Sequence, residues 1–134
     1  MVRYLLDTNI LSDVIKNPQN IVAKRIATMN NNEILTSIIV ASELRYGAAK
    51  KGSIPLTERV NTILTYLTVM PLDIDADYHY GQLRMQLEAR GEVIGANDLL
   101  IAAHALAIDA VLVTDNTKEF ERIHGLKVEN WLRE

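Results

Sequence analysis

Two short apolar runs, residues 2–6 and 110–114, constrain the fold more than any other feature of the sequence. Runs of this length and composition are typical of strands that are buried inside a sheet. Each run ends in an acid, Asp7 after the first and Asp115 after the second. Neighbouring parallel strands lie about 5 Å apart, and open α/β sheets bind ligands at the carboxyl edge of such strands. If the two strands are neighbours, both carboxylates meet at that edge.

The rest of the chain alternates helical patterns with short strand-like runs. Apolar spacing, capping residues, Gly and Pro predict helices over 10–16, 21–29, 38–51, 55–68, 76–90, 99–108 and 118–122, and strands over 33–36, 69–72 and 127–129. This alternation favours an α/β fold, with a short, mostly parallel central sheet and helices on both faces. A chain of 134 residues is the size of one domain, so we expect a single domain over residues 1–134.

Local signals also place the starts of two helices. Ser37 is expected to cap the helix over 38–51, and Asp75 the helix over 76–90. Acids alternate around Asp75 as they do in a calcium loop, but the glycine and the distal glutamate of such a loop are missing. Capping is therefore the preferred interpretation of these acids.

Composition excludes several classes of protein. The 14 basic and 17 acidic residues give a net charge of −3, which argues against a protein that coats nucleic acid by bulk electrostatics. The absence of Cys excludes disulfides and thiolate metal sites and fits a reducing compartment. No apolar run approaches a membrane span or a signal peptide, so we expect a cytoplasmic protein without membrane contact.

Two further carboxylates have unusual positions. Glu43 lies beside an apolar stripe of its predicted helix, and Asp98 stands at the first turn of the helix over 99–108, which is apolar almost all the way round. A simpler explanation is that Asp98 complements the helix dipole and that Asp7 does the same for the helix after it. The coincidence of these acids with Asp115 favours a constellation of four carboxylates instead.

Four crowded carboxylates raise one another's pKa unless a cation joins them. His104 has no partner at metal-ligand spacing and is interpreted as a packed or hydrogen-bonded side chain. A site made of oxygen ligands alone favours Mg²⁺, with Mn²⁺ as a possible substitute. Such a site suits hydrolysis of a phosphodiester, and it would let an acidic protein approach a polyanion.

Four motifs in this order carry a resemblance to a known family. They are LLDTNIL at 5–11, SELRYGAAK at 42–50, IGANDLLIAAHALA at 94–107 and VTDNTKEFERI at 113–123. The chain resembles the PIN-domain ribonucleases, and within them the VapC toxins of type II (VapBC) toxin–antitoxin systems. The resemblance covers nearly the whole chain and implies a PIN-like three-layer sandwich.

The resemblance also assigns roles to six positions. By resemblance the catalytic acids are Asp7, Glu43, Asp98 and Asp115, of which Asp7 and Asp98 are the expected metal ligands, while Asn9 and Thr114 support the site by hydrogen bonding. One departure from the family pattern is Ala96, where relatives often have proline. This change should loosen the unfolded chain and cost a little stability without abolishing activity.

The family implies an activity and partners. The expected activity is Mg²⁺-dependent endonucleolytic cleavage of RNA, often a tRNA in its anticodon region, with growth arrest as the outcome. The expected partner is a VapB-type antitoxin, and homodimers of the toxin are common. Apolar residues at Met29, Ile63 and Leu67 could receive an antitoxin helix, although core packing explains them equally well.

Basic side chains that could meet RNA phosphates are Lys16, Arg45, Lys50, Lys51, Arg84, Lys118 and Arg122. Most of them are equally explained as solvated or helix-terminal charges. Arg45 stands out because it lies two residues from Glu43.

Two other functions remain open at the level of sequence. A receiver-like signalling module also places acids at strand ends and binds Mg²⁺ to accept a phosphoryl group, but no lysine follows the last strand in the place such a module needs. A catalytically inactive PIN-like binding domain is the other alternative, and the presence of all four acids argues against it.

Overall fold

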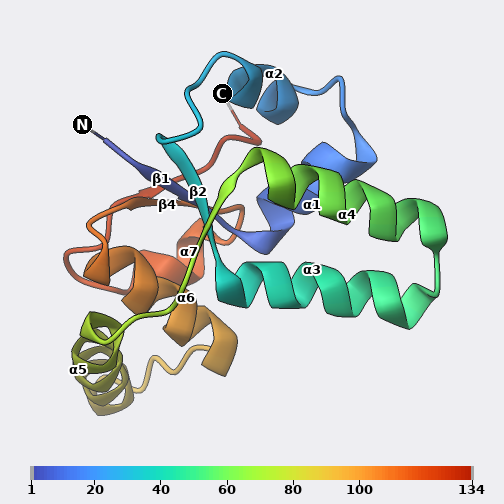
Figure 1. Ribbon diagram of the computed structural model, residues 1–134. Coiled ribbons are helices and arrows are strands. Elements are labelled where there is room, and N and C mark those ends of the chain that lie inside the picture. The colour runs from blue at the N-terminus through green and yellow to red at the C-terminus, as the bar shows by residue number, and fades with distance from the viewer. Residues whose placement is uncertain (1, 134) are drawn as a thin grey trace.

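The structure is a computed structural model that describes residues 2–133. Within them the chain forms five strands and seven helices (Figure 1). In chain order these are β1 (Tyr4–Leu6), α1 (Thr8–Lys16), α2 (Ile21–Ala27), β2 (Ile34–Ser37), α3 (Ile38–Lys51), α4 (Ile54–Tyr66), β3 (Thr68–Met70), α5 (Asp75–Ala89), α6 (Ala96–Ala107), β4 (Val111–Val113), α7 (Thr117–Phe120) and β5 (Val128–Glu129).

The sheet has the strand order β3-β2-β1-β4-β5. Every pairing in it is parallel, where the sequence predicted a mostly parallel sheet. The central strand β1 lies between β2 and β4, and Leu6 is in register with both Thr36 and Val113. The two strands that end in acids are therefore neighbours, as expected, and their carboxyl ends share one edge.

Helices cover both faces of this sheet. Figure 1 shows α1, α3 and α4 on one side and α5, α6 and α7 on the other. The arrangement confirms the predicted α/β architecture with helices on both faces. Helices α3 and α6 contact each other, although they belong to different crossovers. This contact brings two distant parts of the sequence to the same end of the sheet.

Several predicted helix ends are confirmed. Ser37 caps α3, because its Oγ accepts the Ile39 backbone N–H at 3.1 Å. The helix ends at Gly52, whose φ of 61° lies in the left-handed region that glycine adopts without steric cost. The prediction for α4 ran two residues too far, because Leu67 is already extended ahead of β3.

The prediction that Asp75 caps α5 is wrong. Asp75 is the first residue of the helix, and Ile74 occupies the capping position without a side-chain bond. The turn begins earlier, because Ala76 N–H donates to the Asp73 carbonyl and the Asp73 carboxylate accepts the Ile74 N–H at 2.7 Å.

The core lies on both faces of the sheet. Leu5, Leu6 and Leu112 are fully buried, as the apolar runs predicted. His104 is also buried, and its Nδ1 lies 2.8 Å from the Ser37 Oγ, which confirms a packed and hydrogen-bonded histidine. Within residues 2–133, no helix combines the length and apolar character needed to cross a membrane.

Candidate active site

Asp7 is the most buried of the carboxylates at the carboxyl edge of the sheet. It lies between β1 and α1, is 4% exposed, and caps α1. One carboxylate oxygen accepts the Thr8 backbone N–H at 2.8 Å, and the other accepts the Thr114 hydroxyl at 2.7 Å. Burial raises the pKa of Asp7, and these two hydrogen bonds partly oppose that rise. The capping and site interpretations of Asp7 are thus compatible, since only one oxygen is used by the cap.

Glu43 reaches the same place from the middle of α3. Its Oε1 accepts the Thr8 hydroxyl at 2.6 Å, and its Oε2 accepts the Asn97 amide at 3.4 Å. These bonds tie α3 to the starts of α1 and α6. Glu43 is therefore positioned by the residues that follow Asp7 and precede Asp98 in the chain.

Asp98 lies in the first turn of α6 and is half-buried. Its pKa is raised to about 7, first by burial and then by a hydrogen bond with Glu119 and by the negative charges of Glu119, Asp7 and Glu43. Glu119, Asp7 and Glu43 therefore lie close enough to Asp98 for their charges to raise its pKa. Three of the predicted catalytic acids are therefore brought together.

Glu119 is a member of this group that the sequence analysis missed. It lies on the short helix α7, where its Oε2 accepts the Asn116 amide at 2.7 Å and its Oε1 accepts the Gly95 N–H at 3.4 Å. The signal that could have found it is its position directly before the buried Phe120, which fixes the orientation of α7. Attention to strand ends alone favoured Asp115, four residues earlier.

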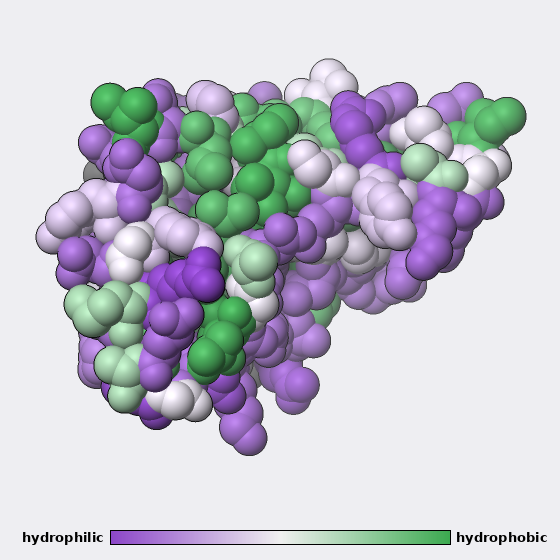
Figure 2. All heavy atoms as spheres, turned by 90° about the horizontal axis from the view of Figure 1, so that it is seen from below, coloured by the Kyte–Doolittle hydropathy of each residue, from purple (hydrophilic) through white to green (hydrophobic). Residues whose placement is uncertain are grey.

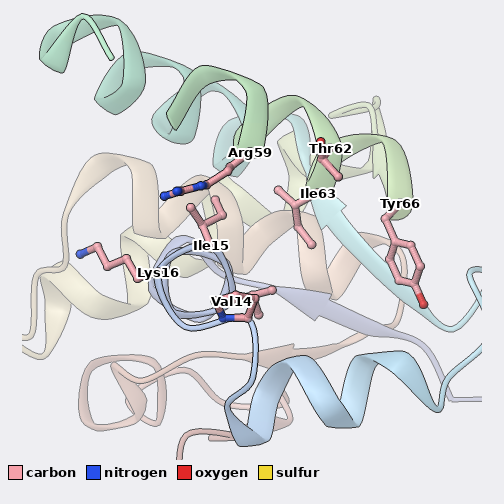
Figure 3. Close-up of a pocket in the computed structure, with 8 residues that line it drawn as sticks. Val14, Ile15, Lys16, Arg59, Thr62, Ile63 and Tyr66 are labelled. Carbon is pink, nitrogen blue, oxygen red and sulfur yellow. The ribbon is translucent and has the colours of Figure 1, made fainter. Parts of the chain in front are cut away.

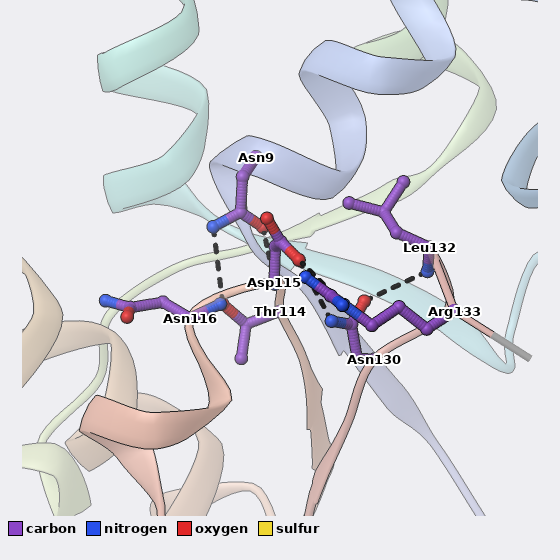
Figure 4. Close-up of polar contacts among 7 residues, drawn as sticks. All are labelled: Asn9, Thr114, Asp115, Asn116, Asn130, Leu132 and Arg133. Carbon is purple, nitrogen blue, oxygen red and sulfur yellow. Dashed lines mark hydrogen bonds and ion pairs between the residues drawn. The ribbon is translucent and has the colours of Figure 1, made fainter.

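Asp115 occupies a different environment from the other predicted acids. Its side chain is exposed and faces the C-terminal segment, where the Asn130 amide donates to it at 3.0 Å and the Arg133 Nε lies 3.9 Å away (Figure 4). The chain bends at Asp115 after β4 has ended, which leaves this side chain exposed while the preceding Thr114 is buried. Thr114 bonds to Asp7, whereas the side-chain contacts of Asp115 are with Asn130 and Arg133.

Asn9 and Thr114 occupy the supporting positions that were predicted for them. The Asn9 side-chain Oδ1 accepts the Asp115 backbone N–H at 3.0 Å, and the Asn9 Nδ2 donates to the Thr114 hydroxyl at 3.4 Å (Figure 4). The Asn116 N–H also donates to that hydroxyl at 3.0 Å. The Thr114 hydroxyl is thereby oriented so that its own proton points to Asp7.

The donor set fits a hard divalent cation that keeps several waters. Within residues 2–133, none of the four clustered carboxylates is in an ion pair with a basic side chain. In the same part of the chain, no three acidic or histidine side chains lie close enough together to form a complete set of metal ligands. Mg²⁺ takes only one or two carboxylates directly and fills its other positions with water, which suits this looser arrangement. Burial contributes most to the raised pKa of Asp98, and the negative charges of Glu119, Asp7 and Glu43 add to it.

Comparisons with known proteins identify the family of this chain. A family model described as PIN domain matches residues 4–126. The chain belongs to the PIN domain family. It is 42% identical to Ribonuclease VapC2 of Rickettsia felis over 130 residues, which cover 96% of this chain and 97% of the relative. It is 36% identical to the tRNA(fMet)-specific endonuclease VapC of Shigella flexneri, covering 98% of this chain and 99% of the relative.

Solved structures give the same result. The crystal structure of VapBC2 from Rickettsia felis bound to a DNA fragment from its promoter contains a chain with a TM-score of 0.91 and 40% identity, covering 98% of this chain and 99% of that one. A DNA-bound VapBC from Salmonella typhimurium gives a TM-score of 0.87 and 36% identity, covering 98% and 99%. The receiver-like interpretation of the fold is therefore excluded.

Two of the basic residues predicted near the site are engaged elsewhere in this PIN domain. Arg45 donates to the Asn61 side chain at 2.6 Å and so links α3 to α4. Arg84 pairs with Glu88 on the exposed side of α5. Neither contacts an acid of the cluster.

A separate apolar cavity of this PIN domain lies between α1 and α4. It has a volume of 440 Å³, and its lining includes Val14, Ile15, Pro18, Ile63 and Tyr66 (Figure 3).

Of the apolar residues considered for antitoxin binding, Ile63 lines this cavity. Leu67 is 5% exposed and belongs to the core, so of the two explanations given for this residue, core packing is the one that the structure supports.

Proposed function

We propose that this PIN domain is a Mg²⁺-dependent endoribonuclease and the toxin of a type II toxin–antitoxin pair. The observation that carries the proposal is the cluster of Asp7, Glu43, Asp98 and Glu119 at the carboxyl edge of the sheet, because no basic side chain of residues 2–133 neutralises it. Relatives that are named ribonucleases over nearly the whole length of the chain support it.

The chain's residues divide the work of hydrolysis. Asp7 and Asp98 would hold the cation, and Mn²⁺ would substitute for Mg²⁺. When bound, the ion supplies neutralisation of phosphate charge and activation of a water molecule. Thr114 keeps the Asp7 carboxylate fixed through their 2.7 Å bond, and Thr8 does the same for Glu43 at 2.6 Å. In the reaction, water attacks phosphorus, the bond to the leaving oxygen breaks, and that oxygen takes up a proton.

The proposal is tested by incubating the purified protein with RNA. Cleavage is expected with Mg²⁺ and its loss with EDTA. Asp98→Asn should abolish cleavage, while the matched change Asp77→Asn on the exposed first turn of α5 should preserve it. RNA that stays intact under all metal conditions would favour the inactive binding domain, whereas cleavage that resists EDTA would reject the metal mechanism.

For the substrate we propose tRNA, cut in the anticodon region of a cytoplasmic pool. The support is the pair of relatives from Shigella flexneri and Salmonella typhimurium that are named tRNA(fMet)-specific endonucleases. Sequencing the RNA ends produced in cells that express the protein alone would test this. Ends that map to messenger or ribosomal RNA would reject it.

For the partner we propose a VapB-type antitoxin that lays an apolar segment into the α1–α4 cavity. The cavity is open at the surface and offers Ile63 and Tyr66 as apolar contacts (Figure 3). Ile63→Asp should weaken inhibition by the antitoxin encoded beside this protein and leave RNA cleavage intact. Unchanged inhibition would place the antitoxin elsewhere.

We also propose a homodimer. Large apolar side chains are exposed at the starts of α5 and α3, with Ile74 79% and Ile38 42% exposed. On the face seen in Figure 2, apolar surface is gathered in patches between polar ones. Ile74→Asp should convert the dimer to a monomer by light scattering, whereas Ile54→Asp, at a side chain that is 73% exposed at the start of α4, should not.

A further inference from the structure

A second cavity begins at Glu43 and runs away from the acids between α1 and α3. Its volume is 260 Å³. One wall is formed by Thr8, Ser12 and Lys16, and the other by Glu43, Gly47 and Lys51. Each wall is a row at four-residue spacing, so the two rows are facing ridges of the two helices. We call this cavity the α1–α3 groove.

The groove has one acidic end and one basic end. At the acidic end Thr8 donates to Glu43 at 2.6 Å. Lys16 and Lys51 lie eight residues further along their helices, about 12 Å away at 1.5 Å per residue. Both lysines are exposed, and within residues 2–133 neither is in an ion pair. Figure 3 shows the Arg59 guanidinium extending toward the same side as the Lys16 ammonium, and both residues line the neighbouring α1–α4 cavity.

Gly47 keeps the middle of the groove open. It lies inside α3, where glycine costs about 1 kcal/mol relative to alanine. A Cβ at this position would meet no atom within 4 Å, so packing does not require a glycine here. A larger side chain would instead project into the space that the groove leaves free.

We infer that the α1–α3 groove holds the RNA strand on one side of the bond to be cut, with backbone phosphates bound by Lys16 and Lys51. The inference rests on the proposed ribonuclease function. A protein with a net charge of −3 needs a local cationic site to hold a polyanion, and this one is continuous with the catalytic cluster. Phosphate contacts position a strand without reading its sequence, and the apolar floor at Leu56 and Val60 can accept sugar and base surfaces.

The role of the two lysine charges is tested by measuring how tightly single-stranded oligoribonucleotides bind. The measurement uses Asp98→Asn protein, because the proposed function expects this variant to leave RNA intact. Adding Lys16→Ala and Lys51→Ala should weaken binding to the same extent for unrelated RNA sequences. The slope of log affinity against log salt concentration should also become shallower by roughly 1 for each lysine removed. The charge-matched pair Lys24→Ala and Lys127→Ala should leave both unchanged. Equal binding by the two double variants would overturn the inference.

Gly47 gives a test that leaves charge unchanged. Gly47→Leu should raise KM for RNA about tenfold or more with little change in kcat, while Gly47→Ala, whose added methyl meets no atom within 4 Å, should raise KM much less. Thermal unfolding should show both variants to be at least as stable as the parent. A normal KM for Gly47→Leu would reject an RNA strand in the groove. If Gly47→Leu also escaped inhibition by the antitoxin, the groove would be a binding site for the antitoxin instead. If the unmodified protein cleaved no RNA at all, that result would instead reject the proposed function.

Discussion

The Thr114 hydroxyl donates to the Asp7 carboxylate at 2.7 Å and so joins the ends of β4 and β1, although 107 positions separate the two residues. Both side chains are buried, so no solvent replaces the bond if it is lost. Thr114→Val keeps the shape of the side chain but removes the donor. We expect a loss of about 1–3 kcal/mol in the free energy of unfolding and a weaker Mg²⁺ affinity.

Urea unfolding and Mg²⁺ titration would measure both effects. Thr65→Val, on the exposed side of α4, is the control and should change neither. Wild-type stability in Thr114→Val would mean that the carboxylate finds another donor.

A second prediction concerns pH. The pKa of Asp98 is raised from 3.8 to about 7 in the folded protein, so the folded state holds the proton more tightly than the unfolded state. Its contribution to stability is full below pH 3.8 and is lost as the pH rises toward 7. We therefore expect the metal-free protein to become less stable between about pH 4 and about pH 7, and Mg²⁺ to stabilise it more at pH 8 than at pH 5.

Thermal unfolding with and without Mg²⁺ checks this. Asp98→Asn should flatten the pH dependence, and Asp77→Asn should retain it. A pH profile that Asp98→Asn leaves unchanged would assign the effect to another group.

A third prediction separates Glu119 from Asp115. Glu119 hydrogen-bonds Asp98 within the acid cluster, whereas Asp115 is held by Asn130 beside the C-terminal segment. Glu119→Gln should lower RNA cleavage or Mg²⁺ affinity by about 10–100-fold, and Asp115→Asn should have a much smaller effect. Cleavage rates at saturating and limiting Mg²⁺ would show the difference. The reverse order of effects would restore Asp115 to the catalytic role that its motif suggested.

A fourth prediction concerns Ala96, the first residue of α6. Proline is favoured at this position of a helix, and Gly95 already has the extended conformation, with φ −61° and ψ 153°, that precedes proline. Ala96→Pro should therefore stabilise the protein by about 0.4–1 kcal/mol through the unfolded state. Ala49→Pro, in the interior of α3, should destabilise it by about 3 kcal/mol or more. Urea midpoints measure both changes, and a destabilised Ala96→Pro would show that the N–H of residue 96 has a role.

The sequence was sufficient for the parts of the fold that strong local patterns determine. The apolar runs that end at Asp7 and Asp115 predicted two interior strands, which the structure pairs in parallel, and Ser37 predicted the start of α3. The start of α5 was misplaced, because aspartates at 73 and 75 offer nearly equal caps and only the backbone turn selects between them.

Sequence reasoning predicted three of the four acids of the candidate site and missed Glu119. Asp7 and Asp98 come together because a strand end and a helix start fix them, and Glu43 joins them from the middle of α3. Position along the chain could not show which way a side chain leaves the turn after β4. That direction places Thr114 inward and Asp115 outward, and it leaves the fourth carboxylate to Glu119 on the next helix.

The central place of β1 in the sheet has a consequence for how the site is lost. The Asp7 backbone N–H donates to the Val113 carbonyl at 2.9 Å, between strands that are covered on both faces. Amide hydrogens at this point can exchange with solvent only when the whole sheet opens. Glu43 and Glu119 lie on helices α3 and α7, outside the sheet. Local opening of these helices can therefore separate the two side chains from the site, while the backbone that holds Asp7 stays folded until global unfolding.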